Sequence, residues 1–341
     1  MKMTKATANT RKKKQRARVV GVAGLGINAT DTIIHLPHFP AHDSKVEIVS
    51  MERKAGGQVA SAMVACRRWG LAARYVGKIG SDAAGKFQKG EMAREGVDAR
   101  WIVVPGAQSQ SAFILVDAAT GERTVLWKRD EKIALAAGDL KRSWISGARA
   151  LLVDGHDTAA ATRAAKWARK ENIPVVGDFD NRYPNVEALL QYVDYAVTSK
   201  DFPERLTGER DLLKSLPKIF STFKCHLIAA TLGRLGVLAW DGEHFILCPG
   251  FLVAAVDTTG AGDIFHGAFV YGLVQGWGME AILEFSCAAA ALNCTAVGAR
   301  GGIATLGAIA KLPNRGPRSE RAFTSTELSE AAKAQRLGDR Q

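Results

Sequence analysis

Residues 257–269 read DTTGAGDIFHGAF and follow directly on the apolar segment FLVAAV. Gly260 and Gly262 permit backbone angles that other residues avoid, so the chain can turn there. The residues after them, IFHGAFVYGLVQG, have helical spacing. Free N–H groups at the start of such a helix form a cradle for an anion. By itself the stretch predicts a helix start with an anion site, where Asp263 is either a helix-capping acid or a base beside the anion.

The surrounding chain alternates between strands and helices. From about residue 145, four short apolar segments are typical of strands: ARALLVDG, PVVGDFD, YAVTS and HLIAATLG. The segments between them are predicted helices: TAAATRAAKWARKENI, NVEALLQY and ERDLLKSLPKIFSTF. This order predicts an α/β fold with a mostly parallel sheet covered on both faces. Ligands of such sheets bind at the carboxyl ends of the strands.

The first half of the chain adds further elements and two β-rich interruptions. RVVGVAGLG and ARYVGKIG are predicted strands, and GGQVASAMVACRRWG is a predicted helix that ends at Gly70. SDAAGKFQKGEMAREG is a second helix, with Ser81 as its N-cap. Residues 31–55 and 99–128 are rich in strand patterns, with a hairpin turn at AATGER. We expect these two interruptions to form a small separate sheet.

The net charge of +12 lies mostly in the two ends of the chain. Residues 1–18 carry eight Lys and Arg and no acid, and residues 311–341 carry a net +3, which leaves about +1 for residues 19–310. We therefore expect residues 1–17 to be a disordered basic arm and residues 311–341 a linker and disordered tail, rather than nucleic-acid-binding segments. No apolar run approaches the roughly 20 residues of a membrane span.

The five cysteines are scattered along the chain, and none forms a C-x-x-C pair. This pattern predicts neither a zinc site nor a disulfide framework. It is typical of a protein in the reducing cytoplasm.

Two other glycine-rich stretches compete as phosphate sites. GVAGLG at 21–26 looks like a permuted dinucleotide fingerprint, but the non-helical NATDTIIHLPHFP follows it. A dinucleotide site needs a helix directly after the glycines, so an NAD-type oxidoreductase is disfavoured. TLGRLGV at 231–237 lies between two predicted strands and is either a plain turn or part of a nucleotide site.

Taken together, these segments resemble the PfkB/ribokinase family of carbohydrate kinases over residues 18–310. DTTGAGDIFHGAFV is similar to the family's second signature. NATD at 28–31, the pair Gly56–Gly57, VGKIGSDAAG at 76–85 and TLGRLGV follow in the family's order. The resemblance implies a ribokinase-like three-layer αβα domain with a β-sheet lid at the two β-rich segments. It also implies transfer of the γ-phosphate of Mg–ATP to a sugar hydroxyl, and a homodimer formed through the lid.

The resemblance also implies residue roles. Asp263 would be the catalytic base, and the amides of Gly260, Ala261 and Gly262 the anion hole. The remaining assignments fall into three groups: the sugar site with Asn28, Asp31, Gly56 and Gly57; the nucleotide site with Thr231, Gly233, Gly236 and, beside the adenine, Cys287; and a monovalent cation site, usually for potassium, with Asp257, Thr259 and backbone carbonyls near 295–298.

The chain departs from the family pattern at two places. The family's asparagine after the glycine pair is absent, and Gln58 and Ser61 stand there as candidate sugar contacts. The family's N-x-x-E, linked to magnesium and phosphate, is replaced by SKDF at 199–202, where Ser199 and Asp201 are weaker candidates. This variant, together with AVGARGGI near residue 300, favours the ketohexokinase-like branch.

Several residues and functions stay open. Asp178 and Asp180 are turn residues or supports of the site. His156 is expected to be a structural or rim residue, and His266 a packing residue. Arg129 is expected to be an exposed arginine at a strand end, with contact to an anionic substrate from the lid as the alternative. A nucleoside kinase on the same scaffold is the alternative function, although nothing near residues 28–61 requires a nucleobase. A non-catalytic protein that binds nucleic acid through its basic arms is a further alternative, which an intact Asp263 disfavours.

Overall fold

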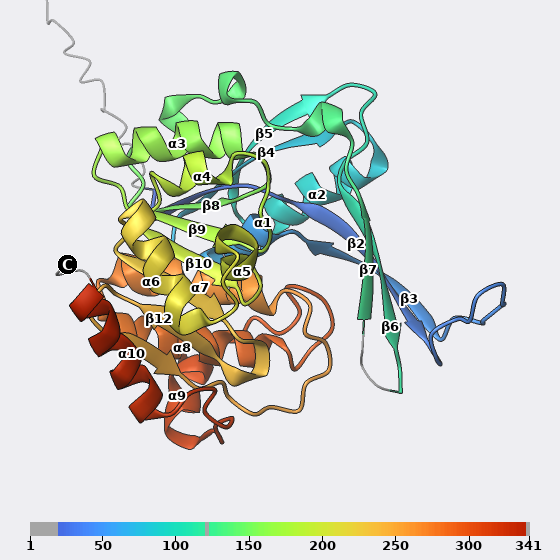
Figure 1. Cartoon of the computed structure of the whole chain (residues 1–341). Coiled ribbons are helices and arrows are strands. Elements are labelled where there is room, and N and C mark those ends of the chain that lie inside the picture. Colours follow the sequence, from blue (N-terminus) through green and yellow to red (C-terminus); the bar gives the residue numbers. More distant parts are fainter. Residues whose placement is uncertain (1–19, 120–122, 339–341) are drawn as a thin grey trace, which may run out of the picture.

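The computed structural model describes residues 20–119 and 123–338 (Figure 1). A nine-stranded sheet runs through the body in the order β13-β12-β11-β10-β9-β8-β1-β4-β5. All neighbouring strands from β11 to β5 in this order are parallel. Strand β12 pairs antiparallel with both β11 and β13. The strands in chain order are β1 (Val22–Leu25), β4 (Ala73–Gly80), β5 (Asp98–Val104), β8 (Leu151–Asp154), β9 (Val175–Phe179), β10 (Tyr195–Ser199), β11 (Leu227–Thr231), β12 (Val237–Trp240) and β13 (Phe245–Cys248).

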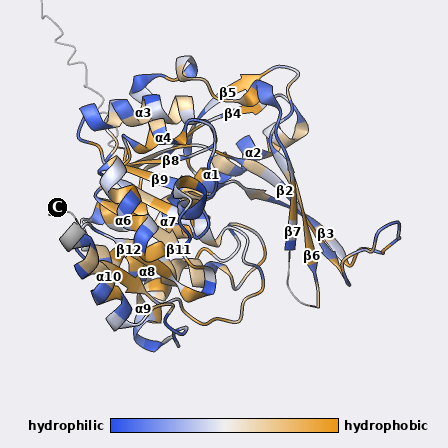
Figure 2. Cartoon of the chain, viewed as in Figure 1, coloured by the Kyte–Doolittle hydropathy of each residue, from blue (hydrophilic) through white to orange (hydrophobic). Residues whose placement is uncertain are grey.

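Helices cover both faces of this sheet because the strands are apolar on both sides. Val22 and Val176 face one core, with α1, α7 and α8, while their neighbours Ala23 and Val175 face the other, with α3 and α6. Figure 2 shows the hydrophobic strands inside the body and hydrophilic residues on the outer helices. The helices are α1 (Gln58–Arg68), α2 (Ala83–Arg94), α3 (Thr158–Lys170), α4 (Val186–Leu190), α5 (Phe202–Thr207), α6 (Leu212–Phe223), α7 (Ala261–Gln275), α8 (Met279–Asn293), α9 (Leu306–Arg315) and α10 (Ser325–Gly338).

A second sheet projects from the body and forms the predicted lid (Figure 1). Its four strands lie in the order β3-β2-β6-β7 around a small core of Ile33, Ala112, Ile114 and Val116. The β6–β7 pair is antiparallel, which confirms the predicted hairpin. The strands are β2 (Ala29–Leu36), β3 (Ser50–Gly56), β6 (Ser111–Asp117) and β7 (Arg123–Lys128).

The second lid segment begins later in the chain than the sequence predicts. The predicted lid segment 99–128 includes β5, but β5 pairs in parallel with β4 at the edge of the large sheet. Trp101 of β5 packs on Tyr75, with ring centroids 5.1 Å apart. β5 therefore belongs to the body, and within the predicted segment 99–128 only residues from 111 onward belong to the lid.

Two other predictions about local structure are wrong. The side chain that caps α2 belongs to Asp82, which accepts a bond from the Gly85 amide at 2.9 Å, and Ser81 does not cap it. The predicted disordered tail contains α10, whose Ala332 is only 4% exposed and belongs to the core beside α6. The predicted basic arm at 1–17 lies outside the described residues. Among the described helices, none is long and apolar enough to cross a membrane.

Asp82 also accepts bonds from the amide and hydroxyl of Ser109, which tie α2 to the start of the lid. We expect Asp82→Ala to lower the free energy of unfolding by about 1–2 kcal/mol, because helix amides lose their cap. Urea unfolding followed by circular dichroism measures this. The neighbouring Ser81→Ala is the control, and an equal loss in both variants would contradict the assignment of the cap.

Candidate active site

A cavity of about 410 Å³ lies between the lid and the carboxyl ends of the parallel strands. The lid supplies Asp31, Ile114 and Trp127, and the end of β9 and the turn after it supply Asp178 and Asp180. The other predicted site residues in its wall are Gly57, Gln58, Ser199, Thr231, Thr259, Gly260, Ala261, Gly262 and Asp263. The sheet topology therefore brings together residues separated by more than 200 positions in the chain, where α/β sheets usually bind ligands.

The start of α7 is built around Gly260. This residue is the N-cap with φ 76°, and a Cβ on it would lie 2.5 Å from the Cα of Ala299. Gly262 faces open space, and no side chain caps the helix. An uncapped helix start with backbone facing a cavity can bind an anion.

Asp263 lies in the first turn of α7 and is half-buried in the cavity wall. Burial raises the pKa of its carboxyl to about 6, Arg300 lowers it and Asp180 raises it. A base works best when its pKa lies near the working pH. The carboxylate thus combines the position and the ionisation that proton transfer beside the anion site requires.

Asp31 is buried in the lid strand β2 and reaches the same cavity. Burial raises the pKa of its carboxyl to about 7, and Asp263 adds to the increase. Its Oδ2 lies so close to the Gly56 backbone that a Cβ on Gly56 would meet it at 1.9 Å. Gly56 does not itself line the cavity. Its missing side chain leaves the space that the Asp31 carboxylate occupies.

Asn28 is buried outside the cavity wall, and neither of its side-chain polar atoms has a hydrogen-bond partner among the described residues. The loop that carries it is held by Asp154 at the end of β8, whose Oδ2 accepts a bond from the Ile27 amide at 2.6 Å. An unpaired buried amide is costly, so this side chain is suited to a ligand.

The structure does not support Ser61 as a sugar contact. Its side chain is fully buried in α1 and lies outside the cavity wall, where it accepts a bond from Arg300 at 3.2 Å. Gln58 does line the cavity, and its Nε2 donates to Asp178 at 3.3 Å. The two side chains lie at different depths, because Gln58 is the first residue of α1 and Ser61 lies about one turn further into the buried part of the helix.

His266 has a larger role than the packing residue we expected. It lines the cavity, and its Nδ1 lies 2.7 Å from the Gly262 carbonyl and 3.3 Å from Asp178. Its Nε2 lies 3.2 Å from the Val197 carbonyl. The ring thus links the anion-site turn to β10 and to Asp178 of β9.

A second histidine, His156, lines the cavity and is hydrogen-bonded through Nε2 to the Tyr183 hydroxyl at 2.8 Å. Burial lowers the pKa of His156 to about 3, so the ring is neutral and unsuited to accept a proton near neutral pH. The expected structural role is consistent with this contact.

The predicted nucleotide residues are only partly brought together. Thr231 and Ser199 line the cavity, and the Ser199 hydroxyl donates to the Asp180 carbonyl at 3.1 Å. Gly233 and Gly236 belong to the turn after β11, and Cys287 is buried in α8; all three lie outside the cavity wall. Asp201 is exposed at the start of α5, away from the cavity wall.

The predicted cation residues surround a tight turn. The carboxylate of Asp257 accepts bonds from the amides of Thr259 and Gly298, both at 2.8 Å. The Thr259 hydroxyl is buried without a hydrogen-bond partner among the described residues, so its oxygen fits a hard cation. Arg123 of the lid contacts Thr258 and lies 3.9 Å from Asp257, a neighbour that the sequence did not reveal.

Arg129 was expected to be an exposed arginine at a strand end, and the structure contradicts this. Its guanidinium lies 2.6 Å from the Asp157 carboxylate, and its side chain is only 17% exposed. The chain folds back after β7, so Arg129 meets the start of α3 instead of solvent.

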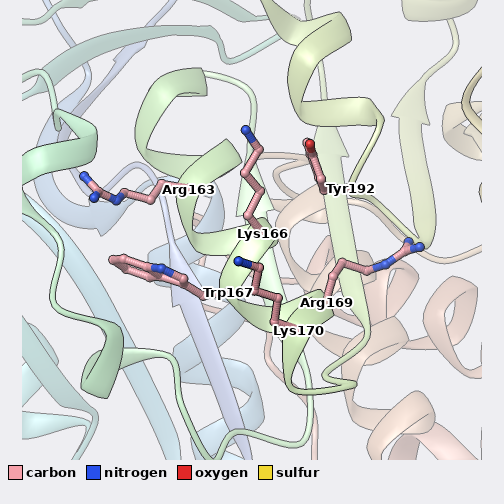
Figure 3. A pocket seen from close by; sticks show the side chains of 6 residues that line it. All are labelled: Arg163, Lys166, Trp167, Arg169, Lys170 and Tyr192. Atoms are coloured by element: carbon pink, nitrogen blue, oxygen red, sulfur yellow. The ribbon is translucent and has the colours of Figure 1, made fainter.

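A separate cavity of about 540 Å³ lies along α3 (Figure 3). Arg163 stacks on Trp167 and Lys166 on Tyr192, at 5.3 and 5.0 Å from the ring centroids. The residues in its wall are Arg163, Lys166, Trp167, Arg169, Lys170 and Tyr192. It contains no carboxylate that could act as a base, so the chemistry is assigned to the cavity under the lid.

Comparison with known proteins identifies the family. The model of the pfkB family carbohydrate kinases matches residues 23–306. The chain belongs to this family. It is 29% identical over 290 residues to the ribokinase of Haemophilus influenzae, covering 82% of this chain and 94% of the relative. It is 25% identical over 297 residues to the 5-dehydro-2-deoxygluconokinase of Clostridium perfringens, with 80% and 85% covered.

The fold matches as well. A solved Arabidopsis thaliana ribokinase, complexed with ribose and ATP, superposes with a TM-score of 0.73 at 21% identity, covering 86% of this chain and 98% of that chain. This similarity confirms the ribokinase-like fold of a large, mostly parallel sheet with a separate smaller one. Membership of the pfkB family makes the chain a phosphotransferase that acts on sugar hydroxyls.

The Gly260 turn can be tested by substitution. We expect Gly260→Ala to lower turnover by about 100-fold or more, because the Cβ displaces the amides of the anion site. Gly278→Ala is the control, since Gly278 also precedes a helix but has φ −66° and open space around it. Steady-state kinetics of both purified variants measures the difference, and equal activity would contradict the role of the turn.

Proposed function

We propose that the pfkB-family chain transfers the γ-phosphoryl group of ATP to a hydroxyl of a small sugar, with Asp263 as the base and the amides of Gly260, Ala261 and Gly262 as the anion hole. The observation that carries the proposal is the pairing of a half-buried carboxylate and an uncapped helix start in one cavity. A kinase site needs these two groups side by side, because one receives a proton while the other holds developing negative charge.

In the proposed reaction, the acceptor oxygen attacks the γ-phosphorus and gives its proton to Asp263. The bond from phosphorus to the bridging oxygen breaks, and ADP leaves with that electron pair. The helix amides hold the negative oxygens of the transferring group throughout. The lid excludes water that would otherwise accept the phosphoryl group.

Magnesium would be held by the ATP phosphates and by Asp180, which lines the cavity beside Ser199 at the ends of β9 and β10. Magnesium sites often use only one or two protein carboxylates together with phosphate oxygens. The bound ion would neutralise phosphate charge. Asp201 is not part of this proposal because it lies outside the cavity wall.

Asp257 and Thr259 would hold a monovalent cation such as potassium, together with backbone carbonyls of residues 295–298. The unpaired Thr259 hydroxyl supports this proposal. The nearby guanidinium of Arg123 already supplies positive charge at 3.9 Å from Asp257. We therefore expect potassium to assist the reaction rather than to be indispensable.

The acceptor is proposed to be a small ketose, pentose or hexose bound by Asn28, Asp31 and Gln58. Asp31 and Gln58 line the cavity. Asn28 lies outside its wall, but both polar atoms of its side chain lack a hydrogen-bond partner among the described residues. A nucleoside is the second candidate, because Val125 and Trp127 of the lid add an apolar wall that suits a nucleobase. The branch of the family, ketohexokinase-like or another, and a cytoplasmic location remain predictions.

We propose a homodimer formed through the lid, because the lid carries exposed apolar side chains. Phe113 pairs with Leu126 across β6 and β7, and these two side chains and Met51 of β3 are more than 50% exposed. Apolar faces of this kind commonly mark a protein interface. A second copy of the chain would cover them.

Replacing the base tests the mechanism. We expect Asp263→Asn to lower kcat by about 100- to 10,000-fold, because proton transfer to the carboxylate is lost. Calorimetric ATP binding should be unchanged. The exposed Asp98→Asn is the control, and turnover of Asp263→Asn near the wild-type value would refute the proposed role.

The ionisation of Asp263 also predicts a pH dependence. The carboxylate must be ionised to accept a proton, and its pKa is raised to about 6. Turnover should therefore be constant above pH 7 and fall about tenfold per pH unit once the pH drops well below 6. A kcat profile between pH 4.5 and 8.5, at saturating substrates, measures this, and a flat profile would contradict it.

An ATP-consumption screen identifies the acceptor. Ketoses, aldoses, sugar acids and nucleosides are compared at equal concentration, with and without potassium. We expect the highest kcat/KM with a neutral sugar, since several carboxylates line the cavity and repel an anionic acceptor. A nucleoside as the best acceptor would favour the second candidate.

A further inference from the structure

His266 lies between the anion-site turn and the acceptor side of the cavity, which is formed by Gln58 and Asp178. Its side chain is only 3% exposed and lines the cavity one helical turn after Gly262. Helix side chains point back toward the N-terminus, and residues four positions apart lie on one face. The imidazole therefore reaches the start of α7, where its Nδ1 lies 2.7 Å from the Gly262 carbonyl oxygen.

The contacts of the two ring nitrogens show where the proton of His266 lies. Burial lowers the pKa of the imidazole, so the ring is neutral near pH 7 and has a single N–H. Both nitrogens face carbonyl oxygens, which can only accept: Gly262 at 2.7 Å from Nδ1 and Val197 at 3.2 Å from Nε2. Two lone pairs repel each other more strongly at the shorter distance. Nδ1 therefore carries the hydrogen and donates to the Gly262 carbonyl.

This hydrogen bond restrains one peptide unit of the anion-site turn. The Gly262 carbonyl lies in the same planar unit as the Asp263 amide. Because glycine has more backbone freedom than any other residue, a peptide unit that begins at a glycine gains from an external restraint. The imidazole thus fixes the orientation at which the proposed anion hole continues into the backbone of the proposed base.

The same ring nitrogen also faces the acceptor side. Nδ1 of His266 lies 3.3 Å from Oδ2 of Asp178, at the end of β9. The other oxygen of that carboxylate accepts from Nε2 of Gln58, also at 3.3 Å. Both residues of the acceptor side line the cavity, and Gln58 is one of the proposed sugar contacts. Contacts therefore run across three elements, from α1 through β9 to the start of α7.

We infer that His266 is a positioning residue that holds the anion-site turn in place against Asp178, so that binding of the sugar and binding of the transferring phosphoryl group strengthen each other. The inference rests on the proposed function, in which Gln58 contacts the sugar and the turn holds the phosphoryl group. Asp178 and His266 are only 4% and 3% exposed. Because protein interiors are close-packed, such buried contacts leave little room for one end to move without the other.

His266→Asn and His266→Leu form a matched pair for the first test. Asparagine and leucine are similar in size and shape, but only the asparagine amide can donate to the Gly262 carbonyl and face Asp178 at the same time. We expect His266→Leu to lower kcat by about 10- to 100-fold, because a small displacement of the turn misplaces the reacting groups. His266→Asn should keep kcat within about threefold of the wild-type value. Steady-state kinetics of the purified variants measures both.

Titration calorimetry gives a second readout that structural damage alone does not produce. Mg–ADP with aluminium fluoride mimics the transferring phosphoryl group, and it is titrated with and without the sugar that has the highest kcat/KM in the acceptor screen. We expect this sugar to tighten binding of the mimic about tenfold in the wild-type chain and in His266→Asn, but by about twofold or less in His266→Leu. The mimic should tighten sugar binding by the same factor, because such coupling is reciprocal. Mg–ADP alone should bind equally well to all three chains.

Val270→Ala is the control for damage to α7. Val270 lies one turn after His266 and is fully buried, but it does not line the cavity. The substitution should lower the thermal stability and leave kcat and the coupling unchanged. If His266→Leu fails to fold, Asp178→Asn still decides the question. An asparagine has one acceptor oxygen instead of two, so it keeps only one of the contacts with Gln58 and His266, and the coupling should fall.

The outcomes separate this inference from the proposed function. An inactive Asp263→Asn together with unchanged coupling in His266→Leu would overturn the inference and leave the proposed function in place. An active Asp263→Asn would overturn the proposed function itself. Equal losses in His266→Asn and His266→Leu would also contradict the inference, because the hydrogen-bond donor would then be irrelevant. The same holds for equal losses in Val270→Ala, which would indicate structural damage only.

Discussion

The site depends on the close packing of Gly260 against Ala299. Because a side chain has no room there, the chain turns sharply and α7 begins at Ala261, with Gly260, Ala261 and Gly262 in the cavity wall. Asp263 then falls within the first turn and in the same cavity wall. A hydrogen bond also holds this turn in place, since the Asp257 carboxylate accepts from the amide of Gly298, the residue before Ala299. One steric constraint therefore places the anion site and the carboxylate together.

Electrostatics determines what this geometry can do. Four acids line one cavity, Asp31, Asp178, Asp180 and Asp263, and burial raises the pKa of each. Their mutual repulsion would keep them protonated without positive charge nearby. Arg300 supplies that charge from the buried side and Arg123 from the lid. The positive end of α7 acts in the same direction.

The sequence predicted some features well and others poorly, for physical reasons. Alternation of apolar segments was sufficient for the large sheet, since burial on both faces leaves a strong pattern. β5 was placed in the lid because a strand's pattern does not reveal its pairing partner. Ser61, His266 and Arg129 were misjudged because their roles depend on neighbours far away in the chain. Arg300 lies 239 positions from Ser61, and no local pattern connects them.

The sequence by itself determined the fold class, the family, and the turn at which a base and an anion site meet. These properties follow from local rules, because glycines, apolar spacing and a helix start act within a few residues. Only the tertiary structure decided how the carboxylates, the lid and the buried arginine surround that turn. Ionisation and orientation depend on burial and on charges from distant segments, and these exist only once the chain has folded.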